Sequence, residues 1–173
     1  MTEQLCIRRA ETSDAANLTV LRQQVWISTY ATEGIRNEFS EYVLAEYTID
    51  TMRSALCDAQ RAILVATLDD HVVGYVEIGL NRPCPVGDFA VPEIMTLYVL
   101  ERFAGQGIGY RLLCEAERWV SDHGYRQVWL DAYHENTRAL EFYARQGYRR
   151  IGISYFEELS ERYENIVFLK DIS

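Results

Sequence analysis

The sequence lacks the features by which several large classes of protein are recognised. No apolar run approaches the roughly 20 residues that a membrane span needs, and the first residues, MTEQLCIRRAETSD, do not have the pattern of a signal peptide. Four cysteines are scattered without paired metal-ligand spacing, which indicates free thiols: Cys6, Cys57, Cys84 and Cys114. Three histidines are also far apart and form no metal-binding pattern: His71, His123 and His134. We therefore expect a cytoplasmic protein that holds no metal.

Positive charge is also scarce. The chain has 17 Lys and Arg residues against 26 Asp and Glu residues, a net charge of −9. Such a chain repels nucleic acid and anionic membranes, so neither is an expected partner, whereas a cationic ligand would be attracted. At 173 residues with 49% hydrophobic residues, the chain is long enough to bury a core as a single domain over 1–173.

Hydrophobic periodicity and turn residues predict a mixed α/β chain. Up to residue 100 the expected elements are a strand at 5–9, a helix that starts after the capping residues 12–14 and passes through Trp26, a shorter helix between 41 and 59 with a break near 48–50, strands at 61–68 and 72–80, a loop at 81–92 holding all three prolines, and a strand at 92–100. After it come a helix from Ile108 to about Gly124, a strand at 126–133, a helix at 137–146 capped by Asn136, and strands at 148–159 and 163–172. This order indicates helices layered on a sheet.

Three glycines alternate with other residues in AGQGIGYRLL, residues 104–113, between an expected strand and an expected helix. The lysine of a P-loop is missing. A dinucleotide-binding reading, which Asp131 at the end of the next strand makes tempting, would need a third glycine at Tyr110, and its fingerprint usually opens its domain. The remaining functional reading is a glycine turn that presents backbone N–H groups and a helix N-terminus to a pyrophosphate. A tight strand-to-helix turn with no ligand fits these residues equally well.

The second half of the chain resembles the GNAT superfamily of acetyl-CoA-dependent N-acetyltransferases. The family signature is [QR]-x-x-G-x-[GA] after a strand of the type EIxxLYV, followed by an Asn, A-x-x-[FL]-Y and a glycine-aromatic pair. Here these motifs are EIMTLYV, Ala104–Gly109, Asn136, Ala139, Phe142-Tyr143 and Gly147-Tyr148. Ala104 departs from the pattern, because the family usually has Gln or Arg there. That departure removes a side-chain contact but not the backbone groups of the turn.

The resemblance implies the GNAT fold, a mixed, mostly antiparallel seven-stranded sheet with helices on both faces and splayed central strands. It implies acetyl-CoA as co-substrate, with the pyrophosphate at the turn, the pantetheine arm along the strand before it, and further contacts from the next helix. The positions implied to bind coenzyme A are Leu97, Tyr98, Val99, Gly105, Gln106, Gly107, Ile108, Gly109, Tyr110, Asn136, Arg138 and Arg145. The family is often dimeric, which makes a homodimer a further expectation.

Acetyl transfer to an amine needs a proton acceptor for the amine and a proton donor for the departing thiolate. By resemblance, Tyr143 is the candidate general acid, since a phenol stays protonated at pH 7. Glu93 is the candidate base, acting through water, with Tyr98 as an alternative relay. A backbone N–H near Val99 is the expected oxyanion donor. Core packing of Tyr143 and a salt-bridged Glu93 are the alternatives in which these residues do no chemistry.

The acceptor amine is the least constrained part of the prediction. Carboxylates and aromatic rings in the joint between the first helices and near the last turn suit a cation; the candidates are Tyr30, Glu33, Glu38 and Tyr155, with Glu41, Tyr42, Glu157 and Glu158 nearby. The layout WLxxxxxNxxAxxFYxxxGY is similar to the bacterial polyamine (spermidine/spermine) acetyltransferase branch. A polyamine is therefore the first expectation. Protein N-termini and amino-group toxins or antibiotics remain open, as does a non-catalytic acyl-CoA sensor.

Overall fold

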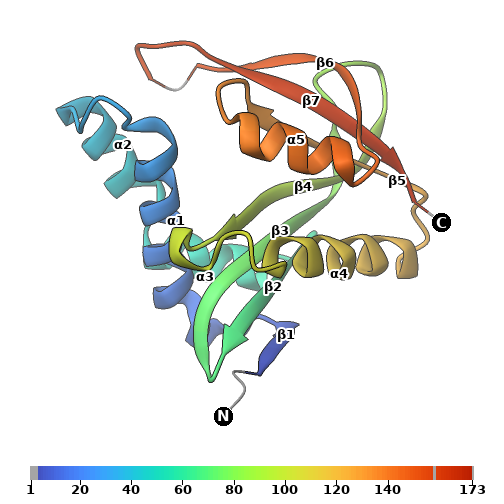
Figure 1. The fold of residues 1–173 in the computed structure, drawn as a ribbon, viewed down its shortest axis with the longest axis horizontal. Coiled ribbons are helices and arrows are strands. Elements are labelled where there is room, and N and C mark those ends of the chain that lie inside the picture. Colours follow the sequence, from blue (N-terminus) through green and yellow to red (C-terminus); the bar gives the residue numbers. More distant parts are fainter. Residues whose placement is uncertain (1–3, 158, 173) are drawn as a thin grey trace. The chain divides into compact units, whose positions relative to one another are not determined.

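The computed structural model describes residues 4–157 and 159–172 (Figure 1). Seven strands form one sheet in the order β1-β2-β3-β4-β5-β7-β6. They are β1 (Leu5–Arg9), β2 (Arg61–Leu68), β3 (His71–Pro83), β4 (Ala90–Val99), β5 (Gln127–Tyr133), β6 (Arg149–Phe156) and β7 (Tyr163–Asp171). The pairs β1–β2, β5–β7 and β6–β7 are antiparallel, whereas β4 and β5 run parallel. The mixed, mostly antiparallel sheet expected from the sequence is confirmed.

Five α-helices lie between these strands in the described part of the chain: α1 (Ala15–Tyr30), α2 (Asn37–Glu46), α3 (Ile49–Cys57), α4 (Ile108–Asp122) and α5 (Thr137–Arg145). Short 3-10 turns precede α1 (Thr12–Asp14) and follow β4 (Glu101–Phe103). By its contacts the chain divides into two compact units, which are described separately below. The first contains residues up to Ile78 and Thr96–Ala116, and the second contains Gly79–Met95 and Glu117–Ser173.

Two sequence expectations are wrong in their boundaries. The single helix expected at 41–59 is two helices, α2 and α3, because Thr48 caps α3: its hydroxyl accepts from the Thr51 amide at 3.1 Å, and the Thr51 hydroxyl accepts from the Thr48 amide at 3.0 Å. The loop expected at 81–92 is much shorter, because β3 continues to Pro83 and β4 begins at Ala90. A backbone bond from Cys84 to Phe89 closes this hairpin; prolines at strand ends remove a donor without ending the pairing.

The first unit has an apolar core between α1, α3 and the strands β2 and β3. Its buried members are Ala15, Leu18, Leu21, Met52, Ala55, Ile63, Val65 and Tyr75. The two terminal guanidinium nitrogens of Arg8 donate to the two carboxylate oxygens of the buried Asp14, at 2.8 and 2.9 Å. This bidentate interaction fixes the start of α1. This guanidinium, more than any other group, lowers the pKa of Asp14. The hydrogen-bonded ion pair ties β1 to the helix that follows it.

The second unit is built around β5, all of which pairs with β7. Trp129 of β5 packs with Cys84, Val167 and Leu169 in an apolar cluster. By contrast, the register between β4 and β5 contains one opposed pair, Glu93 with Trp129. The pairing between the central strands β4 and β5 is therefore short.

Candidate active site

The glycine turn lies in the first unit, between the end of β4 and the start of α4. Gly105 and Gly107 have φ angles of +79° and +81°, a backbone conformation in which side chains with a Cβ are strained. The Arg111 amide donates to the Gly107 carbonyl at 3.0 Å, so Gly107 is the residue that precedes the first turn of α4. Gly107 has no side chain to cap this turn, and residues 105–107 are exposed. The turn thus presents backbone N–H groups at the positive end of a helix dipole.

The other residues of the turn anchor it or extend it. Ile108 is buried and fixes the start of α4, while the Tyr110 side chain is about half exposed, at 51%. The side-chain amide nitrogen of Gln106 donates a hydrogen bond to the backbone carbonyl of Arg102 at 3.3 Å. Gly109 does not have a positive φ, and a Cβ there would meet Val99 at an ordinary 3.8 Å. Only Gly105 and Gly107 therefore need to be glycine for their backbone conformation.

The end of β4, which carries Leu97, Tyr98 and Val99, is held closely against β3. The Leu100 amide donates to the Val73 carbonyl at 2.9 Å. A Cβ on Gly74 would lie 2.8 Å from the Tyr98 carbonyl oxygen, closer than real side chains allow. The Tyr98 ring meets the buried Tyr75 ring edge-on, with centroids 5.9 Å apart. Close packing on the β3 side fixes the strand end that the sequence assigns to the pantetheine arm.

Tyr143, the predicted general acid, is buried on α5 in the second unit, at 8% exposure. Its ring lies among aromatic neighbours, with centroids 5.3 Å from Phe142, 5.7 Å from Tyr148 and 6.1 Å from Phe168. Asn136 caps this helix as predicted, since its side-chain oxygen accepts from the Ala139 amide at 3.2 Å. The capping bond occupies the Asn136 oxygen and leaves its amide NH₂ as the donor for a ligand.

Glu93, the predicted base, is engaged in an ion pair that the sequence did not reveal. Its Oε2 lies 3.0 Å from the Nε of Arg82, on the neighbouring strand β3. The Glu93 side chain is only 14% exposed, against 44% for Arg82. Glu93 therefore meets a permanent cation in the second unit, an arrangement that also fits the purely structural reading of this residue.

Asp131 is a second candidate base that the sequence analysis did not assign to catalysis. It lies on β5, where the Ser154 hydroxyl donates to its Oδ2 at 2.9 Å and the Asn165 amide at 3.3 Å. Burial raises the pKa of Asp131, and these two hydrogen bonds oppose the rise. Its hydrogen-bond partners are neutral, unlike the cation beside Glu93. The available signal in the sequence was a carboxylate directly after the apolar run VWL.

Tyr30, one of the predicted substrate residues, belongs to an aromatic cluster around Trp26 in the first unit. The Trp26 ring lies 4.4 Å from that of Tyr30, and Phe39, Tyr42 and Tyr47 surround it at 5.4, 5.2 and 5.5 Å. The Arg22 guanidinium carbon is 4.5 Å from the centre of the Tyr47 ring. This cluster joins α1, α2 and the residue after α2. The structure thus brings Tyr30 together with aromatic groups.

The predicted carboxylates Glu33 and Glu38 are exposed, on the segment after α1 and at the start of α2. Arg138 and Arg145 are exposed on α5, and Arg145 lies 3.5 Å from Glu141. Side chains in such positions are accessible to a ligand.

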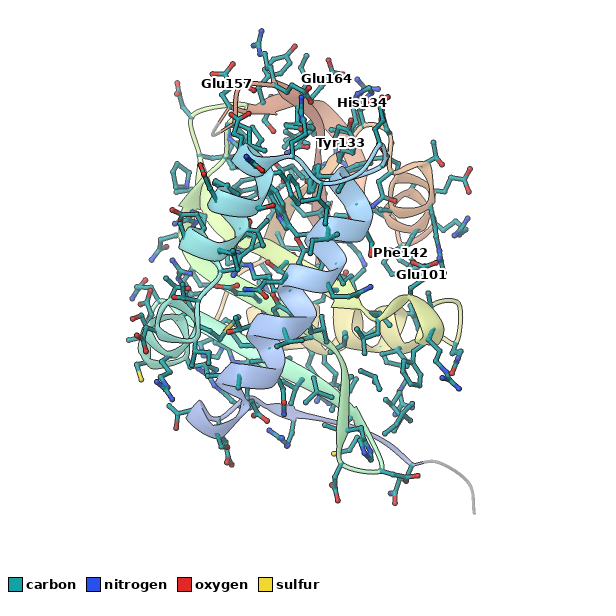
Figure 2. The ribbon with its side chains drawn as sticks, turned by 90° about the vertical axis from the view of Figure 1, so that its left-hand side faces the viewer. Glu101, Tyr133, His134, Phe142, Glu157 and Glu164 are labelled. Carbon is teal, nitrogen blue, oxygen red and sulfur yellow. The ribbon has the colours of Figure 1, made fainter. Side chains whose placement is uncertain are left out.

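Tyr155 lies on β6 in the second unit, and a cation of the chain already covers its ring. The Arg162 guanidinium carbon is 3.4 Å from the ring centre, and Arg162 also pairs with Glu157 at 2.8 Å. Figure 2 shows Glu157 at the end of the molecule where Tyr133, His134 and Glu164 also lie. The neighbouring candidate Glu158 is outside the described residues.

Within residues 4–157 and 159–172, no group of three or more His, Cys, Asp and Glu side chains is arranged to hold a metal ion. No described helix combines the length and the apolar character needed to cross a membrane.

The site thus combines a strand, a glycine turn and a helix N-terminus on a mixed seven-stranded sheet. Residues 29–148, more than half of the chain, match the Acetyltransferase (GNAT) family. The chain therefore belongs to the GNAT acetyltransferase family, a family of acyltransferases.

Two curated relatives of this chain are also named as N-acetyltransferases. An uncharacterized N-acetyltransferase of Mycobacterium tuberculosis is 36% identical over 110 residues, 64% of this chain and 66% of the relative. The matched region thus spans slightly less than two thirds of that relative. A spermidine N(1)-acetyltransferase of Thermoplasma acidophilum is 24% identical over 149 residues, 83% of this chain and 87% of that protein.

Solved structures share the fold across nearly the whole chain. The PaiA N-acetyltransferase of Thermoplasma acidophilum in complex with coenzyme A has a TM-score of 0.76 and 18% identity, covering 97% of this chain and 99% of its own. Arabidopsis thaliana NAA60 in complex with a bisubstrate analogue has a TM-score of 0.72 and 19% identity, covering 98% of this chain and all of its own.

Proposed function

We propose that this chain transfers the acetyl group of acetyl-CoA to a primary amine by direct attack in a ternary complex. The observation that carries the proposal is the exposed glycine turn before α4, within a chain that belongs to an acetyltransferase family. The amine nitrogen bonds to the thioester carbon as the carbon–sulfur bond breaks. The amine loses a proton and the departing thiolate gains one.

The residues of the turn fit the diphosphate of coenzyme A. A Cβ on Gly107 would meet no atom within 4 Å, so the exposed turn leaves room for a ligand beside its backbone. Acetyl-CoA supplies the activated acyl group. The residues proposed to hold it are Leu97, Tyr98 and Val99 along the pantetheine, the backbone of 105–110 at the diphosphate, and Asn136, Arg138 and Arg145 at the arm or the phosphates. Ala104 contributes no polar side chain, so the backbone groups carry the diphosphate contacts.

Tyr143 is proposed to donate a proton to the departing sulfur, and the Val99 N–H to stabilise the oxyanion. The Tyr143 phenol is buried beside the Tyr148 ring, and a phenol ordinarily carries its proton at pH 7. A single oxyanion donor is worth about 3–4 kcal/mol of transition-state stabilisation. These roles need no charged group at the acyl carbon.

The proton acceptor is proposed to be a carboxylate of the second unit. Glu93 is favoured by its position in the EIMTLYV strand, and its pairing with Arg82 is the observation against it. Asp131 is the second candidate, favoured by the raised pKa that burial gives it. A base with a pKa closer to neutrality accepts a proton more readily from a water or an amine.

The acceptor is proposed to be a small cationic amine, with a polyamine as the first candidate. Support comes from the net charge of −9, from the aromatic cluster around Trp26, and from the similarity to a spermidine N(1)-acetyltransferase. The amino group of a protein N-terminus or of a toxin is the second candidate. A non-catalytic acyl-CoA sensor would share the cofactor site.

A panel of amines tests the proposal. The chain is incubated with acetyl-CoA and spermidine, spermine, a peptide with a free N-terminus, or an aminoglycoside, and free thiol and acetylated amine are both quantified. The proposal predicts equimolar thiol and N-acetylated product, fastest with a polyamine. Thermal stabilisation by coenzyme A with no product from any amine would instead indicate the sensor.

A further inference from the structure

A charged cluster in the second unit joins α4, β7 and the turn after α5. The Lys170 amine lies 2.7 and 2.9 Å from the two carboxylate oxygens of Glu117. The Tyr148 hydroxyl donates to the same carboxylate at 3.0 Å. Glu117 and Lys170 are mostly buried, with side chains 16% and 22% exposed, and Lys170 is the single lysine of the sequence. The cluster plays no part in the steps proposed above.

Tyr148 connects this cluster to Tyr143. The two rings meet edge-on with centroids 5.7 Å apart, and the Tyr148 amide donates to the Tyr143 carbonyl at 3.1 Å. Phe168 contacts the Tyr143 ring from β7. Tyr148 is buried at 4% exposure. A shift of the Tyr148 ring would therefore be transmitted to the Tyr143 ring through direct contact in a close-packed environment.

A phenylalanine at position 148 would make the same ring contacts as Tyr148, so the hydroxyl is not needed for this packing. What it adds is a charge-assisted hydrogen bond to Glu117, which fixes the rotation and depth of the ring. Mostly buried ion pairs such as Glu117–Lys170 contribute little net stability, since desolvation offsets their attraction. Their measurable contribution is more often a defined geometry.

We propose that Tyr148, held by the Glu117–Lys170 ion pair, is a positioning residue that sets the orientation of the Tyr143 hydroxyl for proton transfer. This inference rests on the proposed function of Tyr143 as general acid. It assigns to Glu117, Tyr148 and Lys170 an effect on turnover rather than on cofactor or amine binding. Misorientation of a reacting group lowers the rate of the chemical step even when binding is unchanged.

The test is a double-mutant cycle on turnover at saturating substrates. Tyr148→Phe is expected to lower kcat by roughly three- to tenfold with little change in KM, in line with the loss of one orienting hydrogen bond. In a Tyr143→Phe background the same substitution is expected to change kcat by less than about twofold, because no hydroxyl remains to be oriented. Glu117→Gln, which keeps an acceptor for Tyr148 but loses the ion pair, is expected to fall between wild type and Tyr148→Phe.

Tyr163→Phe is a matched control. Tyr163 is a buried tyrosine of the same unit, and its hydroxyl also donates to a glutamate, Glu161, at 3.0 Å. The Tyr163 ring contacts the rings of Tyr133 and Phe156, with centroids 5.7 and 6.2 Å apart. Tyr163→Phe is therefore expected to change the melting temperature about as much as Tyr148→Phe, with kcat unchanged.

Three results would overturn the inference. An equal fall in kcat for Tyr148→Phe in both backgrounds would show a general structural effect and would leave the acid role of Tyr143 standing. Wild-type kcat in both Tyr148→Phe and Glu117→Gln would show that the cluster has no part in turnover. An unchanged kcat in Tyr143→Phe alone would remove the acid role itself, and the positioning role with it.

Discussion

Helices α4 and α5 both begin shortly after a strand, yet their N-termini differ in how they are capped. At α5 the first turn is closed by the chain itself, since the Asn136 side chain accepts from the Ala139 amide. At α4 the residue in the corresponding position is Gly107, which has no side chain to do so and is exposed. The start of α5 is thus closed by a side chain, while the start of α4 is open in the sense that glycine offers no side-chain cap.

We propose that this difference separates two tasks of acetyl transfer, cofactor binding and catalysis. The open start of α4 suits an anion, because unpaired N–H groups and the helix dipole attract negative charge without any side chain. The closed start of α5 suits a rigid helix that places one side chain, Tyr143, in a fixed environment. Cofactor affinity should then depend on the backbone of α4, and turnover on a side chain of α5.

The largest effect is expected from placing a carboxylate at the open helix start. Gly107→Asp should weaken coenzyme A binding by about 100-fold or more, because a fixed negative charge next to the diphosphate repels it and caps the same amides. Isothermal titration with coenzyme A measures the dissociation constant. Gly124→Asp is the matched control, since Gly124 has a φ of +85° and its Cβ position is equally open. Similar affinity losses in the two variants would contradict the assignment of the turn.

Removal of the Tyr143 hydroxyl should affect turnover and not binding. Tyr143→Phe is expected to lower kcat by about 100-fold, at the low end for a general acid, while the dissociation constant of coenzyme A stays within about twofold. Steady-state rates at saturating acetyl-CoA and amine give kcat directly. A loss of cofactor affinity as large as the loss of kcat would mean that α5 also serves binding.

Two substitutions of Asn136 separate its capping role from a role in cofactor binding. Asn136→Ala should reduce the free energy of unfolding by about 1 kcal/mol, because the cap is lost. Asn136→Ser keeps a capping oxygen and should retain most of that stability, while it lacks the amide donor. If Asn136 also contacts the cofactor, both variants bind coenzyme A more weakly than wild type, by roughly fivefold. Wild-type affinity in Asn136→Ser would leave Asn136 with a capping role alone.

The smallest effect is a pH dependence set by Asp131. Burial raises the pKa of Asp131 in the folded protein, so the folded state binds its proton more tightly than the unfolded state. The stability from this group is therefore present below the unfolded pKa and is lost as the pH rises through the folded pKa. Denaturant unfolding should show Asp131→Asn gaining stability relative to wild type between pH 4 and pH 7. A constant difference across that range would contradict the raised pKa.

Features set by neighbouring residues were predictable from the sequence. The bounds of β1 and β2 agree with the strands expected at 5–9 and 61–68, and Asn136 caps its helix as expected. The expectation of a single helix failed at Thr48, because a reciprocal capping box there divides one apolar run into two helices.

Features that join distant parts of the chain were not predictable. Arg82 and Glu93 are brought together by the β3–β4 hairpin, and Asp131 meets Ser154 and Asn165 only because β5, β7 and β6 are adjacent in the sheet. Such pairings alter the charge environment of a candidate base, and no spacing in the sequence reports them. For this reason the position of the glycine turn could be predicted from the sequence, whereas the charge environment of each candidate base could not.

The central claim is that the backbone of residues 105–109 binds the diphosphate of coenzyme A. A crystal structure of the chain with coenzyme A tests it most directly. The account predicts diphosphate oxygens within hydrogen-bonding distance, about 2.7–3.2 Å, of backbone nitrogens in this turn. Coenzyme A bound elsewhere, with these nitrogens in contact only with water, would contradict it.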